Sequence, residues 1–178
     1  MSGNSLNAGL WASGKVLVAP MGTAGPTDVT TAWPAAYLEA GLLDGEQGFE
    51  ETRSETSNDY YAWGGLLVKS TKSKQKRQIK FYALEDNEVV FALVNPGSTR
   101  ATANSLVTSG IKSPTTAEFA IGFEVTDGAK VKRRYCERAT VEAIGNIKES
   151  EAALTVYEIT VTLYPDSNGY LYHEIKAA

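Results

Sequence analysis

The segment from Glu118 to Arg138 constrains the fold more than any other part of the chain. In its first half, apolar residues alternate with small or charged ones, the apolar set being Phe119, Ile121, Phe123 and Val125. Side chains of a β-strand point alternately to its two faces, so this spacing predicts a strand with one buried face. The dipeptide Asp127-Gly128 is typical of a tight hairpin turn. The segment therefore predicts two antiparallel strands joined by that turn.

Similar runs recur along the chain, separated by turn residues such as Asn58-Asp59. We expect further strands at 15–19, 49–57, 60–68, 72–83, 139–147, 153–164 and 170–175. One segment, 85–94, has apolar residues at helical spacing, with Asp86 as the expected N-cap and Pro96-Gly97 beyond its end. A short helical turn is also expected at 33–40. Together these signals predict a mainly β fold: an antiparallel sandwich or barrel with one flanking helix, about 85–94.

The length of 178 residues suits one folded domain. Residues 1–13 are rich in Ser, Asn, Gly and Ala, and we expect a flexible N-terminal arm there, followed by a single β domain over 14–178. The stretch 98–116 is rich in Ser and Thr and is expected to be a long mobile loop that orders only when a partner covers it. No leader peptide or membrane span is indicated, because long apolar runs are missing.

Residue types that carry chemistry are scarce. The chain has one histidine, His173, and one cysteine, Cys136, so neither a zinc site nor an internal disulfide is expected. There is no nucleophile motif around a serine and no phosphate-binding glycine loop. We therefore expect no catalytic residues, no cofactor and no metal, and the protein is not expected to be an enzyme.

The segment 60–83 has the most unusual charge pattern. Aromatic residues flank Gly64-Gly65, and lysines then occupy alternating positions, which on a regular strand gives one basic face: Lys72, Lys74, Lys76 and Lys80. The preceding residues 39–59 hold seven acids and one base. Two interpretations of these acidic and basic segments stay open. They form surfaces that complement one another between copies of the chain, or they are two solvated faces.

These segments supply the candidate site residues. The subunit-interface candidates are Glu46, Glu50, Glu51, Glu55, Lys72, Lys74, Lys76 and Lys80. The expected core anchors are Trp63, Phe81, Val90, Phe119 and Phe123. An alternative function is a monomeric β-barrel module that binds nucleic acid or a small ligand, since small barrels combine basic strands with aromatic residues. An enzyme with scattered carboxylates is a third hypothesis.

The order of several motifs resembles a known family. These are KVLVAP at 15–20, Gly22-Thr23, Pro26-Thr27-Asp28, AGLLDGEQGFEETRSET at 40–56, Ala62-Trp63-Gly64, and EDNEVVFALV with NPGSTR at 85–100. The most specific part is the segment from Leu-Asp-Gly to Glu-Thr followed by the Trp-Gly strand. In this order the chain is similar to the major tail tube proteins of long, non-contractile-tailed (siphovirus-type) bacteriophages.

That resemblance implies a structural virion protein of the tail, made in the host cytoplasm. It implies hexameric rings that stack into a hollow tube, with strands of each subunit closing an inner barrel around the channel for genome delivery. The implied partners are other copies of the chain, a tape-measure protein, and tail terminator and baseplate or distal tail proteins. DNA is expected to pass through the lumen without specific binding, with acids dominating the channel and Lys72, Lys74 and Lys76 facing neighbours or the outer wall. On this reading 60–83 is one arm of an assembly hairpin, rooted at Trp63, with a polar tip.

Overall fold

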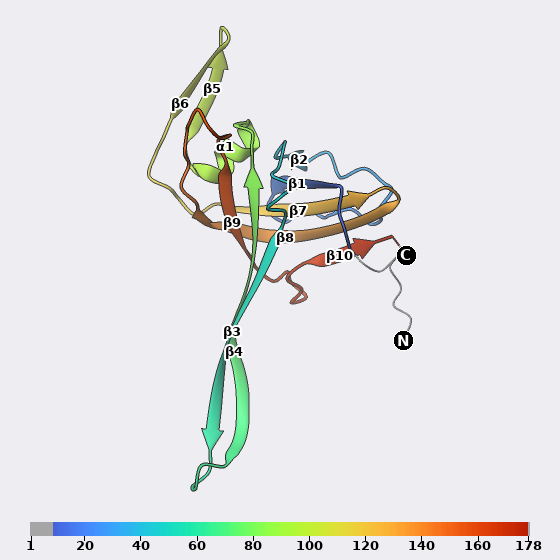
Figure 1. Ribbon diagram of the computed structural model, residues 1–178, viewed down its shortest axis with the longest axis vertical. Coiled ribbons are helices and arrows are strands. Elements are labelled where there is room, and N and C mark those ends of the chain that lie inside the picture. Colours follow the sequence, from blue (N-terminus) through green and yellow to red (C-terminus); the bar gives the residue numbers. More distant parts are fainter. Residues whose placement is uncertain (1–8, 178) are drawn as a thin grey trace.

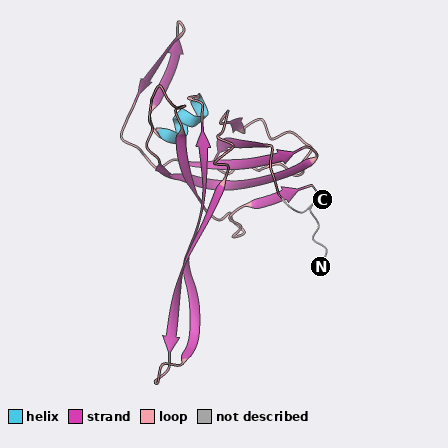
Figure 2. Ribbon diagram, viewed as in Figure 1, coloured by secondary structure: helices cyan, strands magenta, loops and turns pink. Residues whose placement is uncertain are grey.

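A computed structural model describes residues 9–177, and these form a mainly β, antiparallel fold with one helix (Figures 1 and 2). The predicted fold class is confirmed, although the strands of this part of the chain do not close into a barrel. The strands are β1 Ser13–Pro20, β2 Leu38–Glu39, β3 Glu50–Tyr61, β4 Leu67–Ala83, β5 Thr99–Ala103, β6 Leu106–Gly110, β7 Glu118–Asp127, β8 Lys130–Ile144, β9 Tyr157–Leu163 and β10 His173–Lys176, and the helix is α1 Glu88–Val94.

Eight strands form one sheet in the order β2-β1-β7-β8-β9-β4-β3, with β10 pairing to β8 off this path. β7 and β8 are the hairpin expected from the alternating pattern, and Gly128 has the positive φ of +58° that its turn requires. β8 is long because one stretch of it pairs with β10 and a later stretch with β9. β5 and β6 form a separate two-stranded ribbon.

The main core lies between the sheet and the helix. Ile79 and Phe81 of β4 are buried at alternating positions, and Val90 of α1 packs against the same cluster. Phe81 and Phe123 meet edge to face with ring centroids 6.1 Å apart. Phe119 is also buried, so four of the five expected core anchors lie in this cluster.

The opposite face of β1, β7 and β8 is covered by the segment 21–37. The Trp33 ring lies against Gly122, and its indole nitrogen donates a hydrogen bond to a Glu124 oxygen at 2.8 Å. The same oxygen accepts a hydrogen bond from Arg133 Nε at 2.6 Å, and both charged residues are buried. A further Arg133 nitrogen donates to the carbonyls of Asp28 and Thr31. This sheet region is therefore buried on both faces, which gives the fold its sandwich-like character.

Gly122→Ala tests that second layer. A Cβ at this position would lie 2.4 Å from the Trp33 ring, so the indole must move away from the sheet. We expect a loss of about 1–3 kcal/mol in unfolding free energy by urea denaturation. Gly45→Ala is the control, because its added Cβ meets nothing within 4 Å. Equal midpoints for the two variants would contradict the close packing of Trp33.

Several boundaries differ from those expected. The helix begins at Glu88, not 85, because Asn87 and not Asp86 is its N-cap: the Asn87 side-chain oxygen accepts hydrogen bonds from the amides of Val89 and Val90. The segment 33–40 is not helical, since Leu38–Glu39 pairs with β1. β8 runs without a break from 130 to 144, and β9 and β10 begin later than predicted.

The stretch 98–116 is not an open loop, because most of it forms the β5–β6 hairpin. Its turn uses Asn104 and Ser105 with φ of +50° and +63°, and two positive φ values are the geometry of a type I′ hairpin. The expected arm at 1–13 falls mostly on residues 1–8, which lie outside the described part, and β1 already begins at Ser13. Within 9–177, no helix is long and apolar enough to cross a membrane.

Candidate interaction surfaces

The β3–β4 hairpin projects far from the body of the molecule (Figure 1). β4 pairs with β9 only over Arg77–Ala83, so its outer part, up to Lys76, has β3 as its single neighbour in the sheet. Every residue from 52 to 70 is exposed. The outer half of the hairpin therefore contacts no other element of its own chain, and its two strand edges are open to a partner.

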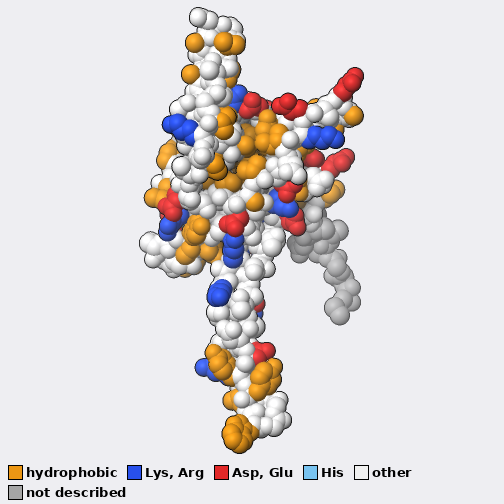
Figure 3. All heavy atoms as spheres, turned by 90° about the vertical axis from the view of Figure 1, so that its left-hand side faces the viewer, with side chains coloured by type: hydrophobic (Ala, Val, Ile, Leu, Met, Phe, Trp, Pro, Cys, Tyr) orange, Lys and Arg blue, Asp and Glu red, His pale blue; other side chains and the backbone are white. Residues whose placement is uncertain are grey.

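The tip of this hairpin, residues 60–68, is apolar. Trp63 is 103% exposed and Leu66 is 71% exposed, and Figure 3 shows apolar side chains gathered at this end of the molecule. The remaining exposed apolar side chains of the tip are Tyr60, Tyr61, Leu67 and Val68. An apolar cluster so far from the core has no role in packing its own domain, which marks it as a binding surface.

Three expectations about this segment are wrong. Trp63 is not a core anchor, Asn58-Asp59 is not a turn but part of β3, and 60–68 is not one strand. The chain reverses at Gly64 and Gly65, whose φ values of +90° and +82° are strained for other residues. The projecting hairpin thus has the Trp at its apex and the polar residues in its stem.

The prediction that the lysines of β4 share one basic face is also wrong. Ser54 pairs with Lys76 and Thr56 with Ser73, so β4 has one extra residue between these pairs, and Lys74 has a φ of +53° there. A β-bulge of this kind shifts the alternation by one residue. Lys72 consequently lies on the face of Glu55, and Lys76 lies on the opposite face.

Most interface candidates already have ionic partners within the chain. Lys72 pairs with Glu55, Lys76 with Glu142 at 2.7 Å, and Lys80 with Glu158 at 3.1 Å and Glu50 at 3.9 Å. The hydrogen bond from Lys76 lowers the pKa of Glu142.

Glu51 lies at a junction of three arginines, Arg53, Arg77 and Arg134. Among residues 9–177, Glu46 and Lys74 are the candidates without an ion pair, and Lys69 and Asp59 near the tip share that property.

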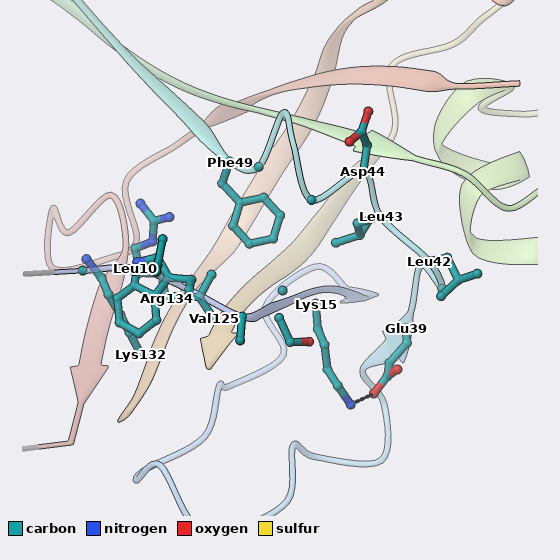
Figure 4. A pocket seen from close by; sticks show the side chains of 18 of the residues that line it. Leu10, Lys15, Glu39, Leu42, Leu43, Asp44, Phe49, Val125, Lys132 and Arg134 are labelled. Atoms are coloured by element: carbon teal, nitrogen blue, oxygen red, sulfur yellow. Dashed lines mark hydrogen bonds and ion pairs between the residues drawn. The ribbon is translucent and has the colours of Figure 1, made fainter. Parts of the chain in front are cut away.

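A second surface is a groove at the root of the hairpin, with a volume of about 720 Å³. We call it the root groove, because Phe49 directly precedes β3 and Glu85 follows β4 closely. Figure 4 shows Phe49 and Leu43 turned toward the middle of the groove. Its lining combines apolar side chains, charged side chains and glycines: Leu10, Trp11, Leu42, Leu43, Phe49, Val125, Lys15, Lys132, Arg134, Glu39, Asp44, Glu85, Gly9, Gly14, Gly41, Gly45 and Gly48, with Ala12 and Ser13.

Each cation of the root groove has an ionic partner within the chain. Lys15 donates to Glu39 at 2.7 Å, which raises the pKa of Lys15. Lys132 pairs with Glu174 and Arg134 with Glu51. Two lining carboxylates, Asp44 and Glu85, have no cationic partner among the described residues, although both accept backbone amide hydrogen bonds. The groove lining is therefore partly apolar and holds three cations and three carboxylates, of which Asp44 and Glu85 have no ion pair among the described residues.

The β5–β6 hairpin projects at the other end of the long axis (Figure 1). Leu106, Val107 and the nearby Ile111 are exposed there. Arg100 anchors the hairpin: its two terminal nitrogens reach the Asp86 carboxylate at 2.7 and 3.1 Å, and its guanidinium lies over the Phe91 ring.

Arg100→Ala tests this anchor. Loss of the bidentate ion pair and of the contact with Phe91 frees the hairpin from α1, so we expect amide hydrogen exchange in 99–110 to speed up by about tenfold or more. Exchange in β7 serves as the internal reference and stays unchanged. Lys112→Ala is the matched control, since Lys112 has no ion pair in residues 9–177. Equal acceleration of amide exchange in 99–110 and in β7 would show that Arg100 supports the whole fold instead.

Catalytic geometry is not seen in the described residues. His173 is 3.2 Å from Asp166 and stacks on Tyr135. Cys136 is buried, and that burial raises the pKa of its thiol. No group of three or more His, Cys, Asp or Glu side chains in 9–177 is arranged to hold a metal.

Comparison with known proteins gives one family and several distant structures. The sequence model described as phage tail tube protein matches residues 1–177. No curated protein sequence matches.

Among solved structures, an extracellular contractile injection system sheath/tube terminator is 12% identical, with 94% of each chain covered and a TM-score of 0.49. A sheath-tube complex from such a system is also 12% identical, with 93% of this chain and 88% of that chain covered and a TM-score of 0.47. The tube-terminating cap of an anti-feeding prophage is 10% identical, with 91% and 88% covered and a TM-score of 0.49.

Proposed function

The chain belongs to the phage tail tube protein family and is thus a structural tail component, not an enzyme, and on that premise we propose that it assembles into hexameric rings stacked as a hollow tube for genome delivery. Other copies of the chain are its first partners. A tape-measure protein occupies the lumen, and tail terminator and baseplate or distal tail proteins meet the tube ends. Assembly takes place in the host cytoplasm.

The projecting β3–β4 hairpin is the observation that supports this proposal most directly. Residues 52–70 are exposed throughout, and Trp63 at the apex contacts water on all sides. A lone subunit gains nothing from holding an indole there, whereas burial of an aromatic side chain against a neighbour is strongly favourable. Open strand edges on the same hairpin can add to the sheets of adjacent subunits, and a closed ring removes such edges.

The charge pairing supports passage of DNA without specific binding. A channel wall with free ammonium groups would gain affinity for phosphates through counterion release. Lys72, Lys76 and Lys80 each pair with a carboxylate of their own chain. Acids in the channel and lysines directed to neighbours or the outer wall remain part of this proposal, as do the interface roles of Glu46, Glu50, Glu51 and Glu55.

The proposed domain organisation is an N-terminal arm over 1–13 and one β domain over 14–178. The continuous sheet, in which β1 lies four places from β4 in strand order, supports a single domain. The arm is proposed to order on contact with a neighbouring subunit.

Electron microscopy and light scattering of the purified protein test the function. We expect six-fold rings or tubes about 100 Å wide, from six compact domains of this size around a channel. A protein that stays monomeric at high concentration, and also with tail-end proteins added as initiators, would contradict the proposal. Salt-dependent binding of short DNA by such a monomer would favour the nucleic-acid binding module instead.

A further inference from the structure

We propose that the root groove is the receptor for the hairpin tip of the next copy, with Trp63 inserted beside Leu43 and Phe49. This inference rests on the proposed function, because it names which surfaces of two subunits meet.

The size and apolar character of the groove are compatible with the hairpin tip. The groove volume of about 720 Å³ lies in the range of pockets that enclose a drug-sized ligand, roughly 300–1,000 Å³, and the apex presents the single large ring of Trp63 beside two glycines. Five glycines in the lining leave space for close approach of the incoming turn. Leu42 at the groove is 67% exposed, so apolar surface is uncovered on both partners.

The unpaired charges of the two surfaces are opposite in sign. Lys69 beside the tip and Lys74 at the bulge midway along the hairpin have no ion pair in residues 9–177, and neither do Asp44 and Glu85 in the groove. Asp59 is the one acid of the outer hairpin without a partner there, so residues 55–74, with three lysines and two acids, carry one net positive charge. Complementary charges of this kind orient a docking surface and fix its register.

The position of the groove requires that its occupant come from a second copy. The tip is separated from the root by the twelve residues of β3, which at about 3.3 Å per residue span roughly 40 Å. A straight ribbon of that length cannot fold its tip back to its own root. Contact between tip and root groove is heterologous, so it repeats from copy to copy at a spacing of at most about 40 Å along the hairpin.

The β5–β6 end is the competing receptor and fits less well. It exposes Leu106, Val107 and Ile111, yet the sequence 99–112 holds no acidic residue and ends in Lys112. Lys69 and Lys74 would therefore meet no counter-charge there.

Cysteine cross-linking in assembled tubes tests the contact. The pair Ala62→Cys with Gly45→Cys places one thiol at the tip and one in the groove, and a Cβ added at 45 meets nothing within 4 Å in the free subunit. Native Cys136 is buried and stays in place. We expect oxidation to give a ladder of dimers and higher multimers, while each single variant gives at most dimers.

The control pair joins the tip to the other hairpin, Ala62→Cys with Val107→Cys. Tubes that form normally but yield the ladder only with this control pair, or with neither pair, would overturn the groove assignment and leave the proposed function intact. Failure of the unmodified protein to form rings or tubes under any condition would instead remove the proposed function and this inference with it.

Charge reversal gives a second readout. Lys69→Glu should raise the protein concentration needed for assembly by about tenfold or more, from the loss of attraction to Asp44 and Glu85 and the new repulsion. Lys112→Glu is matched in charge, also has no ion pair in residues 9–177, and should leave that concentration unchanged. Equal effects of the two variants would contradict the charge match at the groove.

Discussion

The double substitution Trp63→Ser with Leu66→Ser is expected to abolish tube assembly and to leave the unfolding free energy of the subunit unchanged. Trp63 and Leu66 are 103% and 71% exposed, so the free subunit loses no packing when they are replaced. In an assembly, burial of an indole of about 150–250 Å² contributes roughly 4–6 kcal/mol per contact. That contribution recurs at every subunit, so its loss raises the concentration needed for assembly by several orders of magnitude.

Light scattering and electron microscopy measure assembly, and urea denaturation measures the stability of the subunit. The conservative variant Trp63→Phe with Leu66→Met retains apolar surface and is expected to assemble at higher concentration. Leu106→Ser with Val107→Ser, which changes exposed residues of the β5–β6 hairpin, is the matched control and should leave assembly intact. Normal tubes from the variant with serine at 63 and 66 would show that the apolar tip has no part in subunit contacts.

Arg133→Met is expected to destabilise the subunit by about 3–5 kcal/mol. Arg133 and Glu124 form a buried ion pair at 2.6 Å, and Arg133 also holds the carbonyls of Asp28 and Thr31. The variant leaves the Glu124 carboxylate buried with Trp33 as its remaining hydrogen-bond donor. Denaturant unfolding, or the yield of soluble protein if the variant fails to fold, checks this expectation.

Two further variants separate the buried charge from the arginine itself. Arg133→Met combined with Glu124→Leu removes both charges, and we expect it to regain a large part of the lost stability. Arg138→Met removes an exposed pair with Glu118 and should change the midpoint little. If Arg133→Met behaves like Arg138→Met, the ion pair does not hold the segment 21–37 on the sheet.

Alternation and turn chemistry predicted the parts of the fold that depend on local pattern. The β7–β8 hairpin follows from its apolar spacing and from Asp127-Gly128, and the helix follows from Val89, Val90 and Leu93. The predicted N-cap, Asp86, lies one residue before the actual N-cap, Asn87. Both residue types are good N-caps, and only the structure shows that the Asp86 carboxylate pairs with Arg100 instead. Such a choice depends on a residue distant in sequence.

The surfaces were harder to predict, because alternation does not say which apolar residues leave the core. Trp63 was expected in the core, although it lies with Tyr60, Tyr61, Leu66 and Leu67 at an exposed apex. Gly64-Gly65 was a usable signal for the reversal, since two adjacent residues at positive φ suit a turn better than a bulge. The bulge at Lys74 had no such signal, and it divided a basic face that strict alternation predicted to be continuous.

The root groove could not be found from sequence, since it joins residues from 9 to 134 through the fold. The excess of acids between Glu39 and Asp59 was visible, yet its meaning changed once the partners were known. Glu39, Glu50, Glu51 and Glu55 pair with cations of their own chain, and the acids of this segment left without an ion pair in residues 9–177 are Asp44, Glu46 and Asp59. Net charge of a segment is therefore a poor guide to which of its members can bind a partner.

The hairpin apex and the root groove lie at opposite ends of the β3–β4 hairpin. A filament in which each apex binds the groove of the next copy is therefore polar, with two different ends. One extremity of such a filament displays unoccupied apices and the other displays empty grooves, so the two extremities are chemically different. A protein that stops growth at the first must offer an apolar cleft with free carboxylates, whereas one that starts growth at the second must offer an aromatic side chain on a projecting turn. The length of β3 thus sets both the step of the polymer and the distinct chemistry of its beginning and its end.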